Sequence, residues 1–204
     1  MNRHRATRLL ISVLVGVLCA GLIGYMQSRA PGAGGAQNGY VGQKFGGDFT
    51  GLTDHNGTPL TKDAFPGQYQ LVFFGFTNCP AVCPAELQKI TYVLKNLPPE
   101  KRTKLKPILI TVDPERDTPG VLKSYISVFD PAIAGVTGTR ARIDRLISDW
   151  KIYAARVPLE DGGYTMDHSA FLYLRDPEGR LMAVYPHEET PDALLQAVSA
   201  QLGG

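Results

Sequence analysis

The chain has 204 residues, of which 44% are hydrophobic and 20% are charged, a composition typical of a globular protein and not of a disordered one. Beyond residue 26, 18 basic residues face 19 acidic ones, because Arg3, Arg5 and Arg8 precede the first apolar run. This near-neutral balance gives no support to nucleic-acid binding, and we predict no nucleic-acid partner. The length suits one compact domain with an appendage.

The first feature in chain order is an uncharged run of eighteen residues, Leu9 to Met26. As a helix it would measure about 27 Å, close to the hydrocarbon thickness of a bilayer. Positive charge stays on the cytoplasmic side, so we expect a cytoplasmic basic segment at 1–8 and a transmembrane signal anchor at 9–26. The protein would be single-pass in an inner membrane with its C-terminal domain in the periplasm, a bacterial setting being preferred to a mitochondrial one. A cleaved signal peptide is the alternative, although its apolar region is usually shorter.

Residues 27–42 are rich in Gly, Ala and Pro without periodicity, which is typical of a flexible tether. The globular domain then occupies residues 43–204. It opens with DFTGLTDHNGTPLT, which predicts a β-hairpin with its turn at 54–57, and continues with a buried central strand at 70–76. Two histidines, His55 in this turn and His187 before the last predicted helix, are interpreted as surface residues.

Later elements follow from apolar spacing and capping residues. Helices are predicted at 85–97, at 140–150, from Asp117-Thr118-Pro119 onward, and from Thr190 to Leu202. Strands are predicted at 107–112, 133–136 and 152–157, and a hairpin within 169–186. Strands that alternate with helices indicate an α/β fold, and the closing hairpin makes its central sheet mixed.

The stretch NCPAVCP follows the strand at 70–76 and contains Cys79 and Cys83. A disulfide that closes so small a loop removes little chain entropy, so a purely structural bond is disfavoured and a redox or metal-binding pair is the better interpretation. The pair lies between a strand end and a helix start. Reactive groups gather at such strand ends, and a helix N-terminus favours the thiolate, which is both the nucleophile and the metal ligand.

The order of strand, cysteine pair and helix, followed by βαβ and a hairpin, resembles the thioredoxin fold with the N-terminal hairpin of its peroxiredoxin-like branch. The spacing here is Cys-x₃-Cys, and His168 stands in YTMDHSAFLYL where thioredoxins have a cis-proline. In that fold this segment lies beside the cysteine loop, so His168 can reach Cys79 and Cys83. Four positions on a helical turn would place the two Cβ atoms about 5–6 Å apart, which suits one metal and also permits a disulfide.

Two thiolates and an imidazole suit copper as Cu(I), Cu(II) or both. Zinc is the rival, but three ligands without a fourth protein ligand suit a closed structural zinc site poorly. Asp167 could orient the imidazole of His168, and Asp113 and Asp117 lie at a strand end near the expected site. A solvated or backbone-capping role accounts equally well for Asp167, and roles in the turn and as a helix cap account for Asp113 and Asp117.

Four motifs occur in order between Leu71 and Leu181: GFTNCPAVCPAEL, TVDPERDTP, GVTGTR and MDHSAFLYLRDPEGRL. Together they resemble the Sco/SenC family of membrane-anchored copper proteins. The resemblance implies a thioredoxin-like fold that binds copper through Cys79, Cys83 and His168.

It also implies a copper metallochaperone that serves the binuclear copper centre of cytochrome c oxidase subunit II. The expected partners are subunit II or an equivalent copper acceptor, other periplasmic copper chaperones, and the membrane. A thiol–disulfide oxidoreductase that reduces the acceptor cysteines, or a redox sensor, would use the same cysteines. Enzymatic activity therefore stays open, whereas a peroxiredoxin-type peroxidase is disfavoured because the histidine would have no role in it.

Overall fold

The computed structural model describes residues 38–160 and 162–202. The predicted transmembrane segment at 9–26 lies outside these ranges, and no helix within them is long and apolar enough to cross a membrane. The last residues of the predicted tether belong to the described part. They form the short 3₁₀ helix η1 (Asn38–Tyr40), and the Gly42 N–H donates a hydrogen bond to the Leu181 carbonyl at 2.7 Å.

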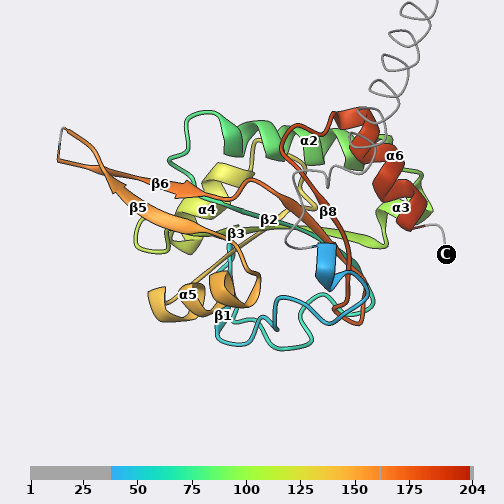
Figure 1. Ribbon diagram of the computed structural model, residues 1–204, viewed down its shortest axis with the longest axis horizontal. Coiled ribbons are helices and arrows are strands. Elements are labelled where there is room, and N and C mark those ends of the chain that lie inside the picture. The colour runs from blue at the N-terminus through green and yellow to red at the C-terminus, as the bar shows by residue number, and fades with distance from the viewer. Residues whose placement is uncertain (1–37, 161, 203–204) are drawn as a thin grey trace, which may run out of the picture. The chain divides into compact units, whose positions relative to one another are not determined.

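Six strands form one mixed sheet in the order β1-β4-β3-β2-β7-β8 (Figure 1). Strands β2, β3 and β4 are mutually parallel, whereas β1, β7 and β8 run antiparallel to their neighbours. The predicted mixed sheet is therefore confirmed. Its strands are β1 (Leu52–Asp54), β2 (Tyr69–Gly75), β3 (Leu105–Thr111), β4 (Ala134–Gly138), β7 (Leu172–Arg175) and β8 (Leu181–Tyr185).

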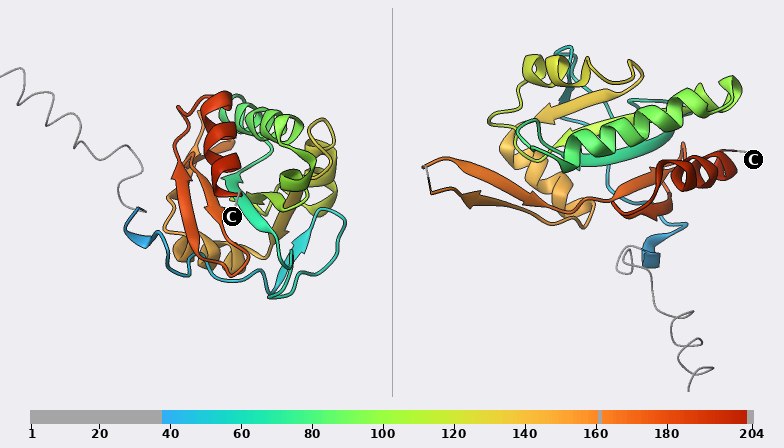
Figure 2. Two further views of the ribbon diagram at one scale, coloured as in Figure 1. Left: turned by 90° about the vertical axis from the view of Figure 1, so that its right-hand side faces the viewer. Right: turned by 90° about the horizontal axis from the view of Figure 1, so that it is seen from above.

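Helices cover both faces of this sheet, with α2 and α6 on one face and α5 on the other (Figures 1 and 2). Successive residues of β2 point to opposite faces, so Gly75 faces Cys83 of α2 while the Phe74 ring lies 5.4 Å from the ring of Trp150, which follows α5. Trp150 is fully buried. The helices are α2 (Val82–Asn96), α3 (Pro99–Arg102), α4 (Pro119–Ile126), α5 (Arg140–Asp149) and α6 (Pro191–Gln201).

Helix α2 begins three residues before the predicted start, at Val82. Pro84 is compatible with this earlier start because it lies in the first turn, where backbone N–H groups have no partner within the helix. Three other helices begin within two residues of their predicted starts. The hydroxyls of Thr118, Thr139 and Thr190 each accept a hydrogen bond from the backbone three residues on.

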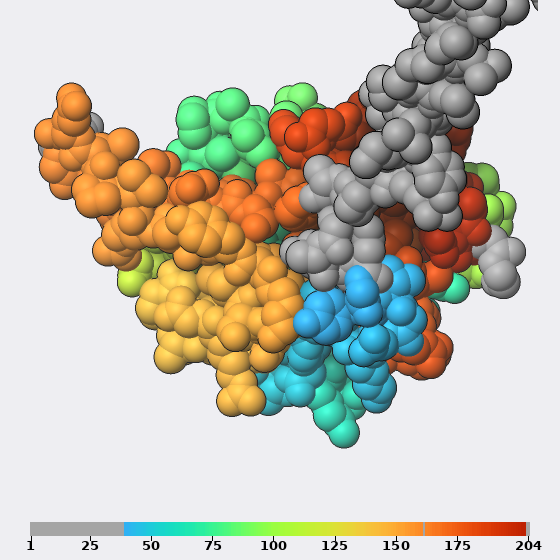
Figure 3. Space-filling view, in the orientation of Figure 1, coloured from blue at the N-terminus to red at the C-terminus, as the bar shows by residue number. Residues whose placement is uncertain are grey.

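Two predictions about strands were wrong in part. The N-terminal hairpin is reduced to one bridge, between Thr53 and Pro59, because β1 pairs with the main sheet instead. The strand predicted at 152–157 exists as β5 (Ala154–Pro158), but it pairs with the unpredicted β6 (Tyr164–His168) in a separate two-stranded sheet. This hairpin stands out from the rest of the domain (Figure 3).

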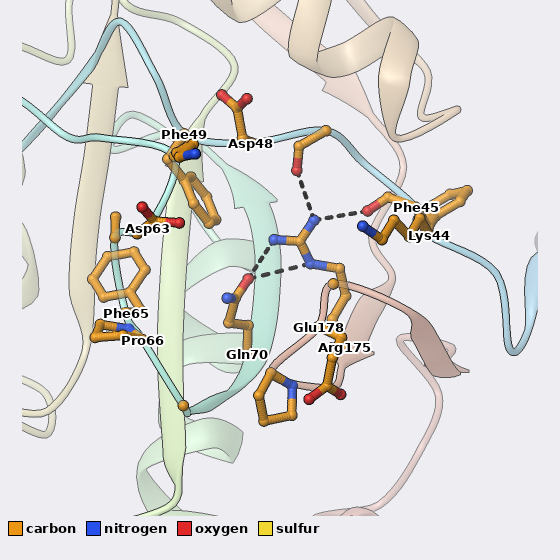
Figure 4. Close-up of a pocket in the computed structure, with 16 residues that line it drawn as sticks. Lys44, Phe45, Asp48, Phe49, Asp63, Phe65, Pro66, Gln70, Arg175 and Glu178 are labelled. Atoms are coloured by element: carbon orange, nitrogen blue, oxygen red, sulfur yellow. Dashed lines mark hydrogen bonds between the residues drawn. The ribbon is translucent and has the colours of Figure 1, made fainter.

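A hollow of about 670 Å³ lies between the N-terminal segment and the β7–β8 turn (Figure 4). The buried guanidinium of Arg175 donates hydrogen bonds to the carbonyls of Phe45 (2.7 Å) and Gly47 (2.9 Å) and to the side chain of Gln70. These bonds attach residues 45–47, which precede β1, to β2 and β7. Because Cys79, Cys83 and His168 do not line this hollow, it is separate from the predicted metal site.

Candidate metal centre

The two cysteines lie where β2 ends and α2 begins. Cys83 is the second residue of α2 and is fully buried, whereas Cys79 is partly exposed in the loop before the helix. The spacing suggested that the two cysteines share a helical turn, but Cys79 lies before the helix. Instead, the Cys83 N–H donates a hydrogen bond to Cys79 Sγ at 3.4 Å, so the sulfur takes the place that a capping oxygen occupies in other helices. Both cysteines are free thiols, and the predicted disulfide stays a prediction.

His168 is the last residue of β6 and brings its ring to the cysteines from 85 residues away in the chain. Its Nδ1 lies 3.0 Å from the Ser169 carbonyl oxygen, which can only accept a hydrogen bond. The proton therefore resides on Nδ1, and Nε2 presents a lone pair to Cys83 Sγ at 3.5 Å. This is the tautomer that a metal bound at Nε2 requires.

Aromatic rings pack against the inner side of the site. The ring of His168 packs edge-on against Phe73 and Phe76, with centroids 6.1 and 5.7 Å away. Burial lowers the pKa of His168, although its bond to Ser169 and the nearby Asp167 oppose the shift. Burial also raises the pKa of the Cys83 thiol. The imidazole is thus held neutral, as a ligand must be, and metal binding must displace a proton from Cys83.

The donor set fits copper. One ligand atom from each of Cys79, Cys83 and His168 can be chosen so that all three lie within 4.8 Å of one another. Two bonds of about 2.0–2.3 Å to a common ion require ligand atoms no more than about 4.6 Å apart, so a small contraction would complete the site. Soft sulfur ligands favour Cu(I), and imidazole binds either oxidation state of copper.

The other predicted residues lie around this cluster. Asp167 is exposed, next to His168 on β6. The carboxylate of Asp113 is buried and is held by the Arg116 guanidinium and by the Tyr164 hydroxyl at 2.9 Å. Whether either aspartate influences a bound metal stays a prediction.

The interpretation of two histidines as surface residues is confirmed for His187 and wrong in part for His55. His187 is 42% exposed, and its Nδ1 lies 2.6 Å from the buried carboxylate of Glu86. His55 is half-buried, and its Nδ1 accepts a hydrogen bond from the Gly135 N–H at 3.1 Å.

One group near the site was not predicted. It is the Ser169 carbonyl, a backbone atom that leaves no signal in the sequence. Asp117 was expected near the site, but with helix capping as an equally adequate role. Thr118 caps α4, and the buried Asp117 carboxylate accepts hydrogen bonds from Thr77 and Thr111. Its place in the turn after β3, which ends at Thr111, was the indication available in the sequence.

The fold and this cluster define a thioredoxin-like protein with a Cys-x₃-Cys pair and a histidine gathered at one point. The family model of SCO1/SenC matches residues 37–203, and the chain belongs to this family.

Among solved structures, copper-bound ScoI of Bradyrhizobium japonicum is similar, with a TM-score of 0.69 and 42% identity over 78% of this chain and 97% of that one. A SCO2-like protein of Rickettsia felis is 36% identical over 92% of both chains. The mitochondrial protein SCO2 of Saccharomyces cerevisiae is 37% identical over 82% of this chain, which spans 56% of the length of the yeast protein.

Proposed function

We propose that this protein is a copper metallochaperone that delivers copper to the binuclear copper centre of cytochrome c oxidase subunit II. The observation that carries the proposal is the convergence of Cys79, Cys83 and His168 within 4.8 Å. Copper is the cargo of such a protein, so the site must both hold the ion and release it. The copper-bound relative named above supports the choice of metal.

The exposure of the ligands suggests how the ion leaves. Cys79 is partly exposed while Cys83 is fully buried, so an incoming acceptor thiolate would meet the Cys79 side of the site first. Exchange of one ligand at a time keeps the ion coordinated throughout. Anchoring by residues 9–26 would hold the domain on the periplasmic side of an inner membrane, where we place subunit II, or an equivalent acceptor, and the copper chaperones that load the site.

Replacement of the imidazole tests the site directly. His168→Ala should weaken copper binding by at least about tenfold, because one of three ligands is lost while both sulfurs remain. Competition titrations with Cu(I) and Cu(II) chelators measure the dissociation constants, and electron paramagnetic resonance reports the Cu(II) ligands. His55→Ala is the matched control, since His55 lies outside the cluster. Parent-like copper binding by His168→Ala would refute the three-ligand site.

A thiol–disulfide oxidoreductase is the second candidate. One observation favours it: a partly exposed cysteine lies against a buried one, with the Cys83 N–H 3.4 Å from Cys79 Sγ. An exposed thiolate can attack a partner disulfide, after which the buried cysteine resolves the mixed disulfide.

His168→Ala separates the two candidates, because disulfide exchange needs no imidazole ligand. If this variant restores oxidase assembly in cells that lack the protein, the redox role is favoured. If it fails although the Cys79–Cys83 disulfide still forms and is reduced, the metallochaperone role is favoured.

A further inference from the structure

Asp117 is a fully buried carboxylate in the turn that links β3 to α4. Its Oδ2 accepts hydrogen bonds from the Thr77 N–H at 3.1 Å and from the Thr111 hydroxyl at 2.6 Å. Its Oδ1 accepts from the Thr77 hydroxyl at 2.6 Å. All three donors are uncharged, and no ion pair found in the described ranges 38–160 and 162–202 includes Asp117.

Asp113 in the same turn provides a contrast. It is equally buried, but the Arg116 guanidinium neutralises its charge. Burial of a charge without a counter-charge costs several kcal/mol in general, so the position of Asp117 needs an explanation beyond hydrogen bonding. An asparagine could keep the geometry, because the Thr77 hydroxyl can rotate and accept from an amide instead of donating to a carboxylate. The charge is therefore the property that asparagine would not supply.

The charge lies next to the cysteine loop. Thr77, which holds both oxygens of Asp117, is two residues before Cys79, so their Cα atoms are at most about 7.6 Å apart. Asp117 also contributes to raising the pKa values of the Cys83 thiol and the Tyr125 hydroxyl, which places both groups within reach of its field. Neither Thr77 nor Thr111 brings a positive charge that would screen it.

We propose that Asp117 positions the cysteine loop and supplies a fixed negative charge that favours Cu(II) over Cu(I) at Cys79, Cys83 and His168. The inference rests on the proposed copper function. Both oxidation states would bind the same ligands, but the attraction between a fixed charge and an ion scales with the charge of the ion. The carboxylate therefore stabilises bound Cu(II) about twice as strongly as bound Cu(I). It tunes the oxidation state that the site holds without touching the ion.

The test compares Asp117→Asn with the parent domain, with separate chelator competition for each oxidation state. The ratio of the Cu(II) to the Cu(I) dissociation constant should rise about tenfold, because the loss of one unit charge near a site in a protein interior has an effect of that order. The Cu(II) resonance spectrum should keep its ligand signature, since the three ligands do not move. Asp144→Asn, which removes an acid whose side chain is 61% exposed on α5, should leave the ratio unchanged.

Thr111→Val separates position from charge, because it removes one donor to Asp117, together with the acceptor of the Asp113 N–H, and keeps the carboxylate. It should weaken binding of both oxidation states by a similar factor. An unchanged ratio in Asp117→Asn would overturn the inference while the copper function stands, and so would a change of the same size in Asp144→Asn. A parent protein that binds neither oxidation state would overturn both. In metal-free protein, the Thr77 amide signal in NMR should move in Asp117→Asn, and an unmoved signal would contradict the positioning role.

Discussion

Replacement of Gly75 by alanine would test how the buried sulfur is held. Gly75 is the last residue of β2, and its missing side chain leaves the space that Cys83 occupies. An added Cβ would lie 3.0 Å from Cys83 Sγ, 2.8 Å from Phe73 Cε1 and 3.2 Å from Leu109 Cδ1. Non-bonded carbon atoms prefer separations of about 3.5–4.0 Å, so all three neighbours would have to move.

The expected effects follow from these overlaps. Overpacking of a buried site by one methyl group typically costs about 1–3 kcal/mol of folding stability. The sulfur would shift by about half an ångström, whereas metal sites tolerate deviations of about 0.2 Å in their bond lengths. Since Cys83 Sγ now lies 3.5 Å from His168 Nε2, this shift would disturb the donor set itself. We expect copper affinity to fall by about 10–100-fold, as for loss of a group that orients a ligand.

Urea unfolding of the metal-free domain and chelator competition for copper measure the two effects. Gly120→Ala is the matched control, because an added Cβ at this exposed position in α4 has no neighbour within 4 Å. That variant should keep parent copper affinity and gain up to about 1 kcal/mol of stability. If Gly75→Ala unfolds at the parent midpoint and binds copper as the parent does, packing against β2 does not fix the sulfur.

Three further predictions concern the fold. Gly46→Ala should lower folding stability by about 3 kcal/mol, because Gly46 has a φ of +83° and an added Cβ would lie 2.2 Å from Trp150 Cε2. Urea unfolding followed by the fluorescence of Trp150, the single tryptophan, measures this loss. A variant that unfolds at the parent midpoint would contradict the packing. Thr190→Ala should lower folding stability by about 1 kcal/mol in the same assay, because Thr190 caps α6. Thr190→Ser keeps a capping hydroxyl and should retain most of the parent's stability. Burial raises the pKa of Asp117 above its ordinary 3.8, so native protein binds more protons than unfolded protein between that value and the folded pKa. The parent should therefore lose folding stability relative to Asp117→Asn as the pH rises through that window, and the stability difference between the two proteins should stay constant above it. Urea unfolding midpoints from acid to neutral pH measure this difference. A stability difference that does not change with pH would refute the prediction.

Much of the fold could be predicted from local patterns. The apolar runs at 70–76 and 107–112 are β2 and β3 to within two residues, and the mixed sheet follows from alternating strands and helices. Strand β6 could not be predicted in the same way. Its side chains are half-buried or exposed, so it lacks the apolar pattern that marks a buried strand, and it is defined by pairing with β5.

The candidate site could also be predicted only in part. Residue chemistry and spacing identified Cys79 and Cys83 as a functional pair, and resemblance to the thioredoxin fold added His168. The Ser169 carbonyl that sets the imidazole tautomer could not be read from the sequence, because every residue carries a carbonyl. The burial of Asp117 could not be predicted from the sequence either, because an aspartate before a threonine and a proline is equally typical of an exposed helix start.

The sequence by itself determined the soft donor set, the family and most of the helices and strands of the main sheet, because these depend on residue type and on short-range periodicity. Tertiary structure alone decided that β6 brings His168 to 3.5 Å from a sulfur 85 residues earlier. It also decided that Gly75 makes room for that sulfur and that Asp117 lies buried without a positive partner among the described residues. Distances between remote residues depend on how the whole sheet closes, and burial depends on what packs above each side chain. Neither quantity is contained in any local stretch of the chain.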